Sequence, residues 1–418
     1  MWPIVVVVVA VALVLLIINL GTPEKKLAYE IRPDFGVADP RFLRLVSCLL
    51  GPPLSRGNRV TTFQNGGRIF PAMLATIAEA RSSVCFETYI YWTGEIGARF
   101  SAALCERARA GVQVHVVLDG VGTKLDESQL EEMRAAGIQV ERFHPLRLLF
   151  LGRINNRTHR KLLIIDGKIG FTGGVGIADQ WQGDAEDAKH WRDVHYRVEG
   201  PVVAQMQAAF MDNWLKTRAT LLQGDAYFPP LESRGDLSAQ LFRSSPDEGA
   251  ESVRLLYLLS IACAQRSVRI ASAYFVPDDL ARDTVISALR RGVRVQIIVP
   301  GRLTDAKLTR QASRSRWGPI LEAGGEIHEY QPTMFHCKVM VVDEVWSSVG
   351  STNFDNRSFR LNDEANLNLH DADFAREQIL AFDADLARSR RITFKDWQGR
   401  PLREKLGENL AGLMRSQM

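Results

Sequence analysis

The chain has 418 residues, a net charge of +4 at pH 7 and five cysteines. Its length predicts two or three domains with substantial hydrophobic cores, and its mild net charge neither indicates nor excludes a nucleic-acid partner. The cysteines are scattered without metal-ligand spacing, which argues for reduced thiols in a reducing compartment and against a disulfide framework.

The N-terminal segment from Trp2 to Leu20 has no charged residue and consists mainly of Val, Leu and Ile. As a helix it would span roughly 28 Å, close to the hydrocarbon thickness of a bilayer. A secretory signal peptide is the alternative, but its basic n-region and small-residue cleavage site are missing. The pattern therefore predicts a transmembrane anchor at 1–22. Lys25 and Lys26 follow the anchor, so the positive-inside tendency predicts catalytic domains in the cytoplasm.

Two stretches mix apolar and basic residues: 41–50, in the membrane-proximal segment 23–58, and 146–153. Such stretches are compatible with the headgroup interface of a membrane. They are equally compatible with an ordinary core helix and a buried loop, and both interpretations stay open.

The rest of the chain consists of two similar halves, predicted as α/β domains at 59–225 and 226–418. In the first half, a helical stretch precedes the apolar strand 112–117; in the second, another precedes the strand 293–298. Each half follows the order helix, strand, helix, strand, connection and a final strand that carries a polar motif. This order is typical of βαβ units and predicts a largely parallel sheet.

The polar motif is His-x-Lys with an Asp five residues after the Lys, and it occurs once in each half. The following apolar runs, 162–165 and 339–342, are typical of strands covered on both faces. Side chains two residues apart on a strand share a face, so each His and Lys should point the same way and Cys337 away from them. Two copies with identical spacing indicate a phosphate-handling site rather than two satisfied strand ends. The motif residues are His159, Lys161 and Asp166, then His336, Lys338 and Asp343.

These motifs and their flanks resemble the phospholipase D superfamily, and most closely the bacterial cardiolipin synthases. The resemblance covers roughly residue 60 to the C-terminus. It implies two α/β domains that face each other across a pseudo-twofold axis, with one active site at the seam and no metal or other cofactor. The segments that carry it are 156–161, 173–174, 191–193, 274–278 and 350–364.

The resemblance also implies roles for the two motifs. His159 would be the nucleophile that forms a phosphohistidine, and His336 the general acid and base. Lys161 and Lys338 would stabilise the negative charge of the transition state. The sequence symmetry alone does not decide which histidine is the nucleophile.

Further residues are assigned by their positions relative to the motifs. Ser351 and Asn353 match phosphate-contacting positions, and Glu364 matches a carboxylate that orients the histidine. In the first half Asp193 is the predicted orienting carboxylate, ahead of Asp187. Such a carboxylate fixes the tautomer of the imidazole.

The first half departs from this pattern, because Gly174 and Gly176 stand where the second half has Ser and Asn. We expect Gly174 and its neighbours to bind phosphate through backbone N–H groups, since glycine lets the chain approach an anion closely. Asp166 and Asp343 are expected to be structural.

The function predicted from these features is a membrane-anchored phosphatidyltransferase that makes cardiolipin, with phosphatidylglycerol as donor and acceptor. One alternative is a phospholipase D that hydrolyses phospholipids to phosphatidic acid. The expected partners are the phospholipid membrane and anionic phospholipids, without nucleic acid, and the expected location is the bacterial inner membrane with a single pass.

A second alternative is a phosphodiesterase or nuclease, which would need a basic groove. A basic cluster near Trp317 suits nucleic acid, anionic lipid headgroups or a solvated helix face. The predicted anchor favours lipid, and the intact motifs with Glu364 disfavour a non-catalytic scaffold. The cluster comprises Arg302, Lys307, Arg310, Arg314 and Arg316.

Overall fold

The computed structural model describes residues 33–145, 155–246 and 252–413, together with residues 2, 6 and 31. The predicted anchor at 1–22 and the stretch 146–153 fall outside this description, apart from residues 2 and 6. Within the described ranges, no helix is long and apolar enough to cross a membrane.

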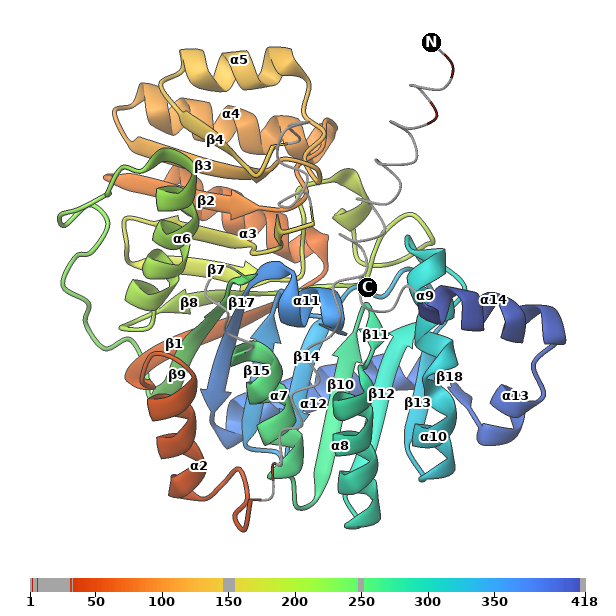
Figure 1. Cartoon of the computed structure of the whole chain (residues 1–418). Helices are drawn as coiled ribbons and strands as arrows, with labels where there is room; N and C mark the ends of the chain where they lie inside the picture. The colour runs from red at the N-terminus through yellow and green to blue at the C-terminus, as the bar shows by residue number, and fades with distance from the viewer. Residues whose placement is uncertain are drawn as a thin grey trace.

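The two halves share one mixed sheet of sixteen strands, to which each contributes its own helices (Figure 1). The prediction of two similar α/β halves is confirmed. From one edge to the other the strand order is β18-β13-β12-β10-β14-β15-β17-β9-β1-β8-β7-β6-β2-β3-β4, and β5 pairs with β17.

The first half begins with β1 and ends with α6. Its elements are β1 (Ser55–Gln64), α3 (Gly66–Ala78), β2 (Ser83–Thr88), α4 (Glu95–Arg109), β3 (Gln113–Asp119), α5 (Glu127–Ala135), β4 (Gln139–Phe143), β5 (Arg157–Thr158), β6 (Leu162–Ile165), β7 (Ile169–Gly173), β8 (Val194–Glu199) and α6 (Val203–Arg218).

The second half repeats this order and adds helices at its C-terminal end. Its elements are β9 (Leu237–Ser244), α7 (Ser252–Ala262), β10 (Ser267–Ser272), β11 (Phe275–Val276), α8 (Asp279–Arg290), β12 (Arg294–Pro300), α9 (Lys307–Ser315), α10 (Trp317–Glu322), β13 (Glu326–Tyr330), β14 (Lys338–Val342), β15 (Trp346–Gly350), β16 (Phe354–Asp355), α11 (Asn356–Arg360), β17 (Asn362–His370), α12 (Ala372–Ala387), β18 (Ser389–Ile392), α13 (Phe394–Gln398) and α14 (Leu402–Leu413).

The prediction of a largely parallel sheet is wrong. Parallel pairing is confined to β2–β3–β4, β10–β12–β13 and the short β5–β17 contact within this sheet. The strands that follow the motifs turn back after three residues, at 166–168 and 343–345, and pair antiparallel as β6–β7 and β14–β15. So short a connection permits only an antiparallel hairpin, whereas a parallel pair needs a long crossover.

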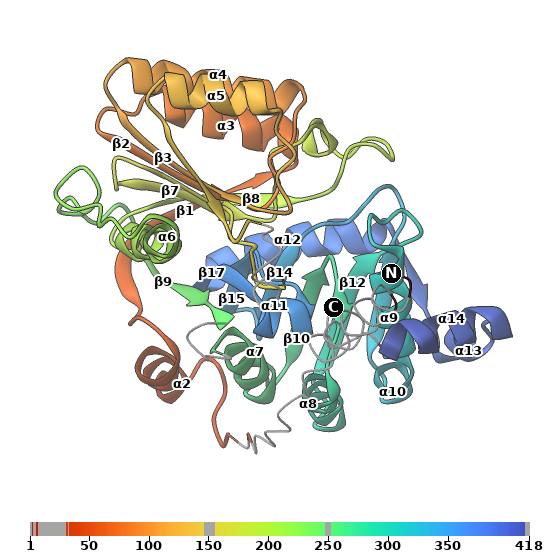
Figure 2. The same ribbon diagram turned by 45° about the horizontal axis from the view of Figure 1, so that its top comes forward.

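Three clusters of buried apolar side chains hold the layers together. Helices α3, α4 and α5 cover the outer face of the first-half strands, with α6 on the opposite face (Figure 2). Helices α7, α8 and α10 cover one face of the second-half strands. The central cluster lies under α6 and α12 and joins the halves, because it takes Leu162 and Phe210 from the first and Val339 and Leu367 from the second.

The stretch 41–50 is a core segment. It forms the helix α2 (Pro40–Leu45) and one further helical turn (Val46–Leu50), which pack against the second half. Phe42 is fully buried and its ring meets the edge of Trp346 with 5.0 Å between centroids. Of the two interpretations open from the sequence, the structure supports the core helix.

Asp166 and Asp343 lie in the two hairpin turns, at φ of 53° and 51°. Each carboxylate accepts hydrogen bonds from three consecutive backbone N–H groups of the segment that leads into the neighbouring antiparallel strand, β2 for Asp166 and β10 for Asp343. For Asp343 the donors are residues 265–267, at 2.8–2.9 Å. The same arrangement joins Asp166 to residues 81–83.

Replacing Asp343 with alanine tests this structural role. The change leaves three N–H groups without their acceptor, so we expect Asp343→Ala to lower the free energy of unfolding by about 2–3 kcal/mol. Urea denaturation followed by tryptophan fluorescence measures it. Asp373→Ala is the control, since that side chain is 88% exposed and its removal should change stability little. Equal stability of the two variants would contradict the assignment.

Candidate active site

The two motif segments lie beside each other because each is hydrogen-bonded to the opposite half. The short strand β5 pairs in parallel with the start of β17, and the His159 N–H donates to the Asp363 carbonyl at 2.8 Å. The other motif repeats this, as the His336 N–H donates to the Arg192 carbonyl at 2.8 Å. We predicted that each His–Lys pair would be part of a strand. In the structure the pairs immediately precede β6 and β14, and only Lys338 is itself in a strand, as the first residue of β14.

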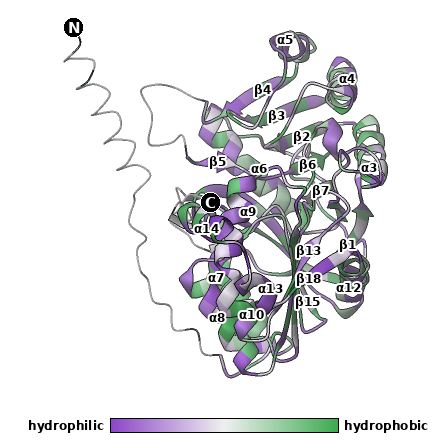
Figure 3. Ribbon diagram, turned by 90° about the vertical axis from the view of Figure 1, so that its right-hand side faces the viewer, coloured by the Kyte–Doolittle hydropathy of each residue, from purple (hydrophilic) through white to green (hydrophobic). Residues whose placement is uncertain are grey.

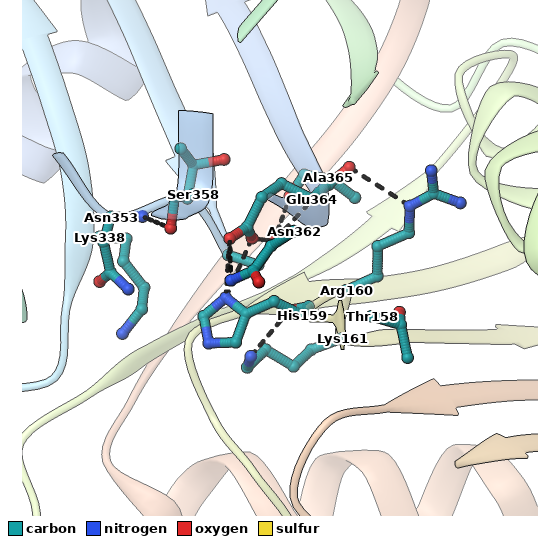
Figure 4. A network of polar contacts seen from close by, with 12 residues as sticks. Thr158, His159, Arg160, Lys161, Lys338, Asn353, Ser358, Asn362, Glu364 and Ala365 are labelled. Atoms are coloured by element: carbon teal, nitrogen blue, oxygen red, sulfur yellow. Dashed lines mark hydrogen bonds and ion pairs between the residues drawn. The ribbon is translucent and has the colours of Figure 1, made fainter. Parts of the chain in front are cut away.

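Each histidine therefore meets a carboxylate from the other half of the chain. His159 Nδ1 lies 3.0 Å from both carboxylate oxygens of Glu364 (Figure 4). His336 Nδ1 lies 2.8 Å from Asp193 Oδ2. Both carboxylates are fully buried. They hold the Nδ1–H tautomer of each imidazole, which leaves Nε2 with its lone pair.

Each carboxylate is itself held by a second donor. The Ser351 hydroxyl donates to Glu364 Oε2 at 2.5 Å, and the Trp181 indole donates to Asp193 Oδ2 at 2.9 Å. The Val194 N–H donates to the other oxygen of Asp193 at 2.8 Å. The two carboxylates thus have fixed orientations before any substrate binds.

Both motif lysines are buried beside the histidines. Lys161 Nζ donates to the His159 carbonyl at 2.8 Å, and Lys338 Nζ donates to the His336 carbonyl at 2.5 Å. Burial lowers the pKa of Lys161 to about 7. Burial also lowers the pKa of Lys338. An anion that enters the site favours the charged form of both lysines and so raises their pKa again.

The same burial keeps the imidazoles neutral. It lowers the pKa of His159 to about 4, although Glu364 acts in the opposite direction. The pKa of His336 is lowered by burial and then by Lys338. At pH 7 the free site therefore holds two neutral imidazoles, the form that a nucleophile and a general base need.

The histidines and Lys161 open into a cavity of about 500 Å³ at the seam between the halves. Aromatic rings form much of its wall. The ring of Tyr89 lies 5.4 Å from that of His159, and the ring of Trp181 lies 5.2 Å from that of His336. The other aromatic residues of the wall are Trp92, Trp191 and Tyr274.

The predicted phosphate-contacting residues occupy different places. Asn353 lines the cavity, and its buried Oδ1 has no hydrogen-bond partner among the described residues. Ser351 is fully buried and gives its hydroxyl to Glu364. Gly174 lies under Asp193, where an added Cβ would come within 2.2 Å of Oδ1. Gly174 is therefore required by the carboxylate that it supports.

Asp187 lies outside this arrangement, since it is exposed and contacts His190 at 2.9 Å. Cys337 is buried on the far side of its strand in the central apolar cluster, as alternation predicted. The sequence reasoning missed Trp181, and it missed Asp355 and Arg357, which line the cavity. Burial raises the pKa of Asp355 to about 7. No sequence pattern relates these three residues to the motifs, so the sequence alone does not predict that they line the cavity.

Arg160, between the motif His and Lys, is fully buried and ties the motif to both halves. Its guanidinium donates to the Glu364 carbonyl at 3.3 Å and to the Ser244 carbonyl at 3.1 Å, and it pairs with Asp212 at 2.9 Å. No role for Arg160 was predicted, because a single arginine before an apolar run has no distinctive pattern.

Comparisons with known proteins agree with this geometry. A family model described as cardiolipin synthase, PLD-like domain matches residues 73–214 and 257–386, one segment in each half. The cardiolipin synthase of Geobacillus kaustophilus (strain HTA426) is 36% identical over 376 residues, which cover 89% of this chain and 75% of the relative. The major cardiolipin synthase of Bacillus subtilis (strain 168) is 34% identical over 361 residues, with coverage of 85% and 75%.

A solved structure shares the fold across nearly the whole chain. It is the phosphatidylserine synthase of Haemophilus influenzae Rd KW20, with a TM-score of 0.70 at 13% identity, and it covers 90% of this chain and 99% of that one. This likeness shows that the two proteins share the fold.

Ser351→Ala distinguishes a residue that positions Glu364 from one that binds phosphate. The hydroxyl donates to Glu364 and does not line the cavity, so its loss should lower kcat about tenfold, as expected for one charge-assisted hydrogen bond, and leave KM within about twofold. Asn353→Ala is the comparison, and there KM should rise. Steady-state kinetics with phosphatidylglycerol in detergent micelles measure both. A raised KM with unchanged kcat in Ser351→Ala would assign the hydroxyl to phosphate binding.

Proposed function

Since the chain belongs to the cardiolipin synthase family of phospholipase D-like proteins and makes cardiolipin, we propose that it does so by transfer between two phosphatidylglycerol molecules. One molecule would give its phosphatidyl group, the other would accept it on the free glycerol hydroxyl, and one glycerol would leave. The observation that carries the mechanism is the crossed pairing of two neutral histidines with two buried carboxylates at one cavity.

In the first step, His159 Nε2 attacks phosphorus and the bond from phosphorus to the glycerol oxygen breaks. The leaving alkoxide takes a proton from His336. This gives a phosphatidyl-histidine and free glycerol, and it divides one difficult displacement into two easier ones. We assign the nucleophile to His159 by the resemblance of its motif. The bidentate approach of Glu364 to its Nδ1 supports the positive charge that the ring acquires.

In the second step, His336 removes the proton of the acceptor hydroxyl, whose oxygen then attacks phosphorus. The bond from phosphorus to His159 breaks, which releases cardiolipin and returns both imidazoles to their starting state. Asp193 stabilises the imidazolium form of His336 before the first step and again after the second, and His336 is neutral between them. Proton transfer of this kind contributes about 10² to 10⁴ in rate.

The negative charge of the substrate sets the protonation states that these two steps require. His336 is neutral in the free site, yet it must carry a proton when glycerol leaves. A bound phosphodiester places a negative charge against both imidazoles, which raises their pKa. Lys161 and Lys338 then face the charge that develops on the phosphoryl oxygens, where water is excluded and the interaction is strong.

The aromatic wall favours transfer over hydrolysis. Trp92, Trp181 and Trp191 line the cavity beside the histidines and would present apolar surface to the glycerol and acyl portion of a lipid. Water would find few partners on that surface, whereas an acceptor lipid would cover it. We place the enzyme at the bacterial cell membrane, with 1–22 as its single-pass anchor and the two halves in the cytoplasm.

The products formed on vesicles of phosphatidylglycerol test the proposed reaction. We expect cardiolipin and glycerol in equal amounts, and a loss of about three orders of magnitude or more in His159→Ala, since removal of a nucleophile abolishes the covalent route. Thin-layer chromatography of the lipids and an enzymatic glycerol assay measure both products. Phosphatidic acid in place of cardiolipin would identify a phospholipase.

A donor lipid with p-nitrophenol as its headgroup tests which histidine is the nucleophile. This leaving group needs no proton, so His336→Ala should still release a burst of about one p-nitrophenol per enzyme and should accumulate the phosphohistidine. The same variant should lose about 10² to 10⁴ in turnover of phosphatidylglycerol. His159→Ala should give no burst. A burst in His159→Ala and none in His336→Ala would exchange the two roles.

A further inference from the structure

Helix α14 presents three leucines to solvent. Leu402, Leu406 and Leu410 follow one another at intervals of four residues and are 77%, 65% and 65% exposed. Residues four apart lie on one face of a helix, so the three side chains form a ridge, here called the leucine ridge. Single exposed leucines are common on protein surfaces, but an aligned row on one helix is an apolar stripe, and none of the described residues covers it.

The opposite face of α14 attaches to the protein through charges. Glu408 is 3% exposed and forms ion pairs with Arg314 and Arg400, each at 2.8 Å. Ala411 packs with Ala312 of α9 in a small apolar cluster. A surface helix normally turns its apolar stripe to the core and its charges to water. Helix α14 departs from this rule, because it buries Glu408 and exposes the three leucines of the ridge.

A basic groove, defined by the cavity of about 940 Å³ between α9, α13 and α14, runs along this helix. Figure 3 places α9 and α14 side by side, and Figure 1 shows α13 next to them. Eight arginines and lysines line the groove against three acidic residues. Four of these cations have no ion-pair partner among the described residues: Arg302, Lys307, Lys395 and Arg403. The groove thus has an excess of positive charge directed at solvent.

One loop joins the groove to the catalytic cavity. Arg302 and Thr304 line the groove, while Asp305 lines the cavity and accepts a hydrogen bond from the Tyr274 hydroxyl at 2.6 Å. A surface that binds to the basic groove therefore lies next to the entrance of the active site.

We propose that the leucine ridge and the basic groove together dock onto the surface of an anionic phospholipid bilayer. The leucines enter the boundary between headgroups and acyl chains, and the free cations contact lipid phosphates. An apolar helix face flanked by basic residues has the composition of an interfacial helix. Each basic residue near an anionic surface adds to the attraction, which salt weakens. The proposal rests on the proposed function, because it assumes that the substrates lie in such a bilayer.

A fluorescent probe on the ridge tests the docking without reference to turnover. In a full-length Cys48→Ser background, which removes the exposed thiol, Leu406→Cys is labelled with an environment-sensitive dye and reconstituted into vesicles. We expect a blue shift in phosphatidylcholine vesicles that contain phosphatidylglycerol, and its reversal in high salt. Leu380→Cys on α12 is the matched control, because Leu380 is 66% exposed and lies outside the ridge.

Three outcomes of this measurement would overturn the proposal. One is equal emission from the dyes at 406 and 380. Another is a shift of the same size in vesicles without phosphatidylglycerol. The third is a shift in detergent alone that grows with protein concentration, which would assign the ridge to a second copy of the chain. A shift that the pair of changes Lys395→Glu and Arg403→Glu abolishes would support the role of the groove.

Enzyme turnover provides a second, independent test of the docking. We expect Leu402→Ser, Leu406→Ser and Leu410→Ser together to lower cardiolipin synthesis on vesicles at least tenfold and to leave it within twofold in detergent micelles. Leu380→Ser should change neither. Equal loss in vesicles and micelles, or no loss in vesicles, would overturn the docking. Absence of cardiolipin from the wild-type enzyme in micelles would refute the proposed function instead, while the dye would still report on docking.

Discussion

The burial of charge at the seam is the constraint on which the rest of the structure depends. Two carboxylates, two lysines and two imidazoles lie almost entirely out of water, and unpaired charges in such a place are strongly destabilising. The cost is offset across the seam, since each carboxylate bonds to the imidazole of the other half. Each also faces a lysine of that half, Glu364 facing Lys161 and Asp193 facing Lys338. Neither half contains a complete set of partners, so the charged groups are satisfied only when both halves are assembled. The continuous sheet and the shared central cluster provide that assembly.

The sequence predicted the parts of the site that depend on local spacing. The duplicated His-x-Lys motif, the apolar strands behind it and the turn of Cys337 away from it follow from alternation along a strand. It did not predict the crossing, because the paired residues are 205 and 143 positions apart. It predicted a largely parallel sheet because the helix–strand alternation was clear, while the three-residue turns at 166–168 and 343–345 were not recognised as hairpins. The place of Ser351 also depends on tertiary contacts, since only the neighbouring strand brings Glu364 to its hydroxyl.

The symmetry of the fold and the asymmetry of the chemistry are reconciled by the residues around each carboxylate. Besides its histidine, Glu364 accepts from the Ser351 hydroxyl and the Asn362 amide, whereas Asp193 accepts from an indole and a backbone N–H. The glutamate approaches His159 with both oxygens at 3.0 Å, and the aspartate approaches His336 with one oxygen at 2.8 Å. The histidines of two motifs with the same spacing therefore have different electrostatic environments. The difference is consistent with the proposed covalent role of His159 and the proposed proton-transfer role of His336.

A buried site for a charged lipid headgroup also requires a way to bring the lipid out of the bilayer. The headgroup of phosphatidylglycerol, the proposed substrate, is anionic, and Lys161, whose pKa is lowered by burial, lines the cavity that would receive it. Moving the acyl chains next to the charged residues of the cavity would not be favourable, so the chains must stay near apolar surface while the phosphate reacts. An interfacial helix beside the entrance would satisfy both demands, because it holds the cavity at the depth of the headgroups and leaves the chains in the membrane. The loop that ends in Asp305 is then the point at which membrane contact and catalysis meet, since its residues line both the groove and the cavity.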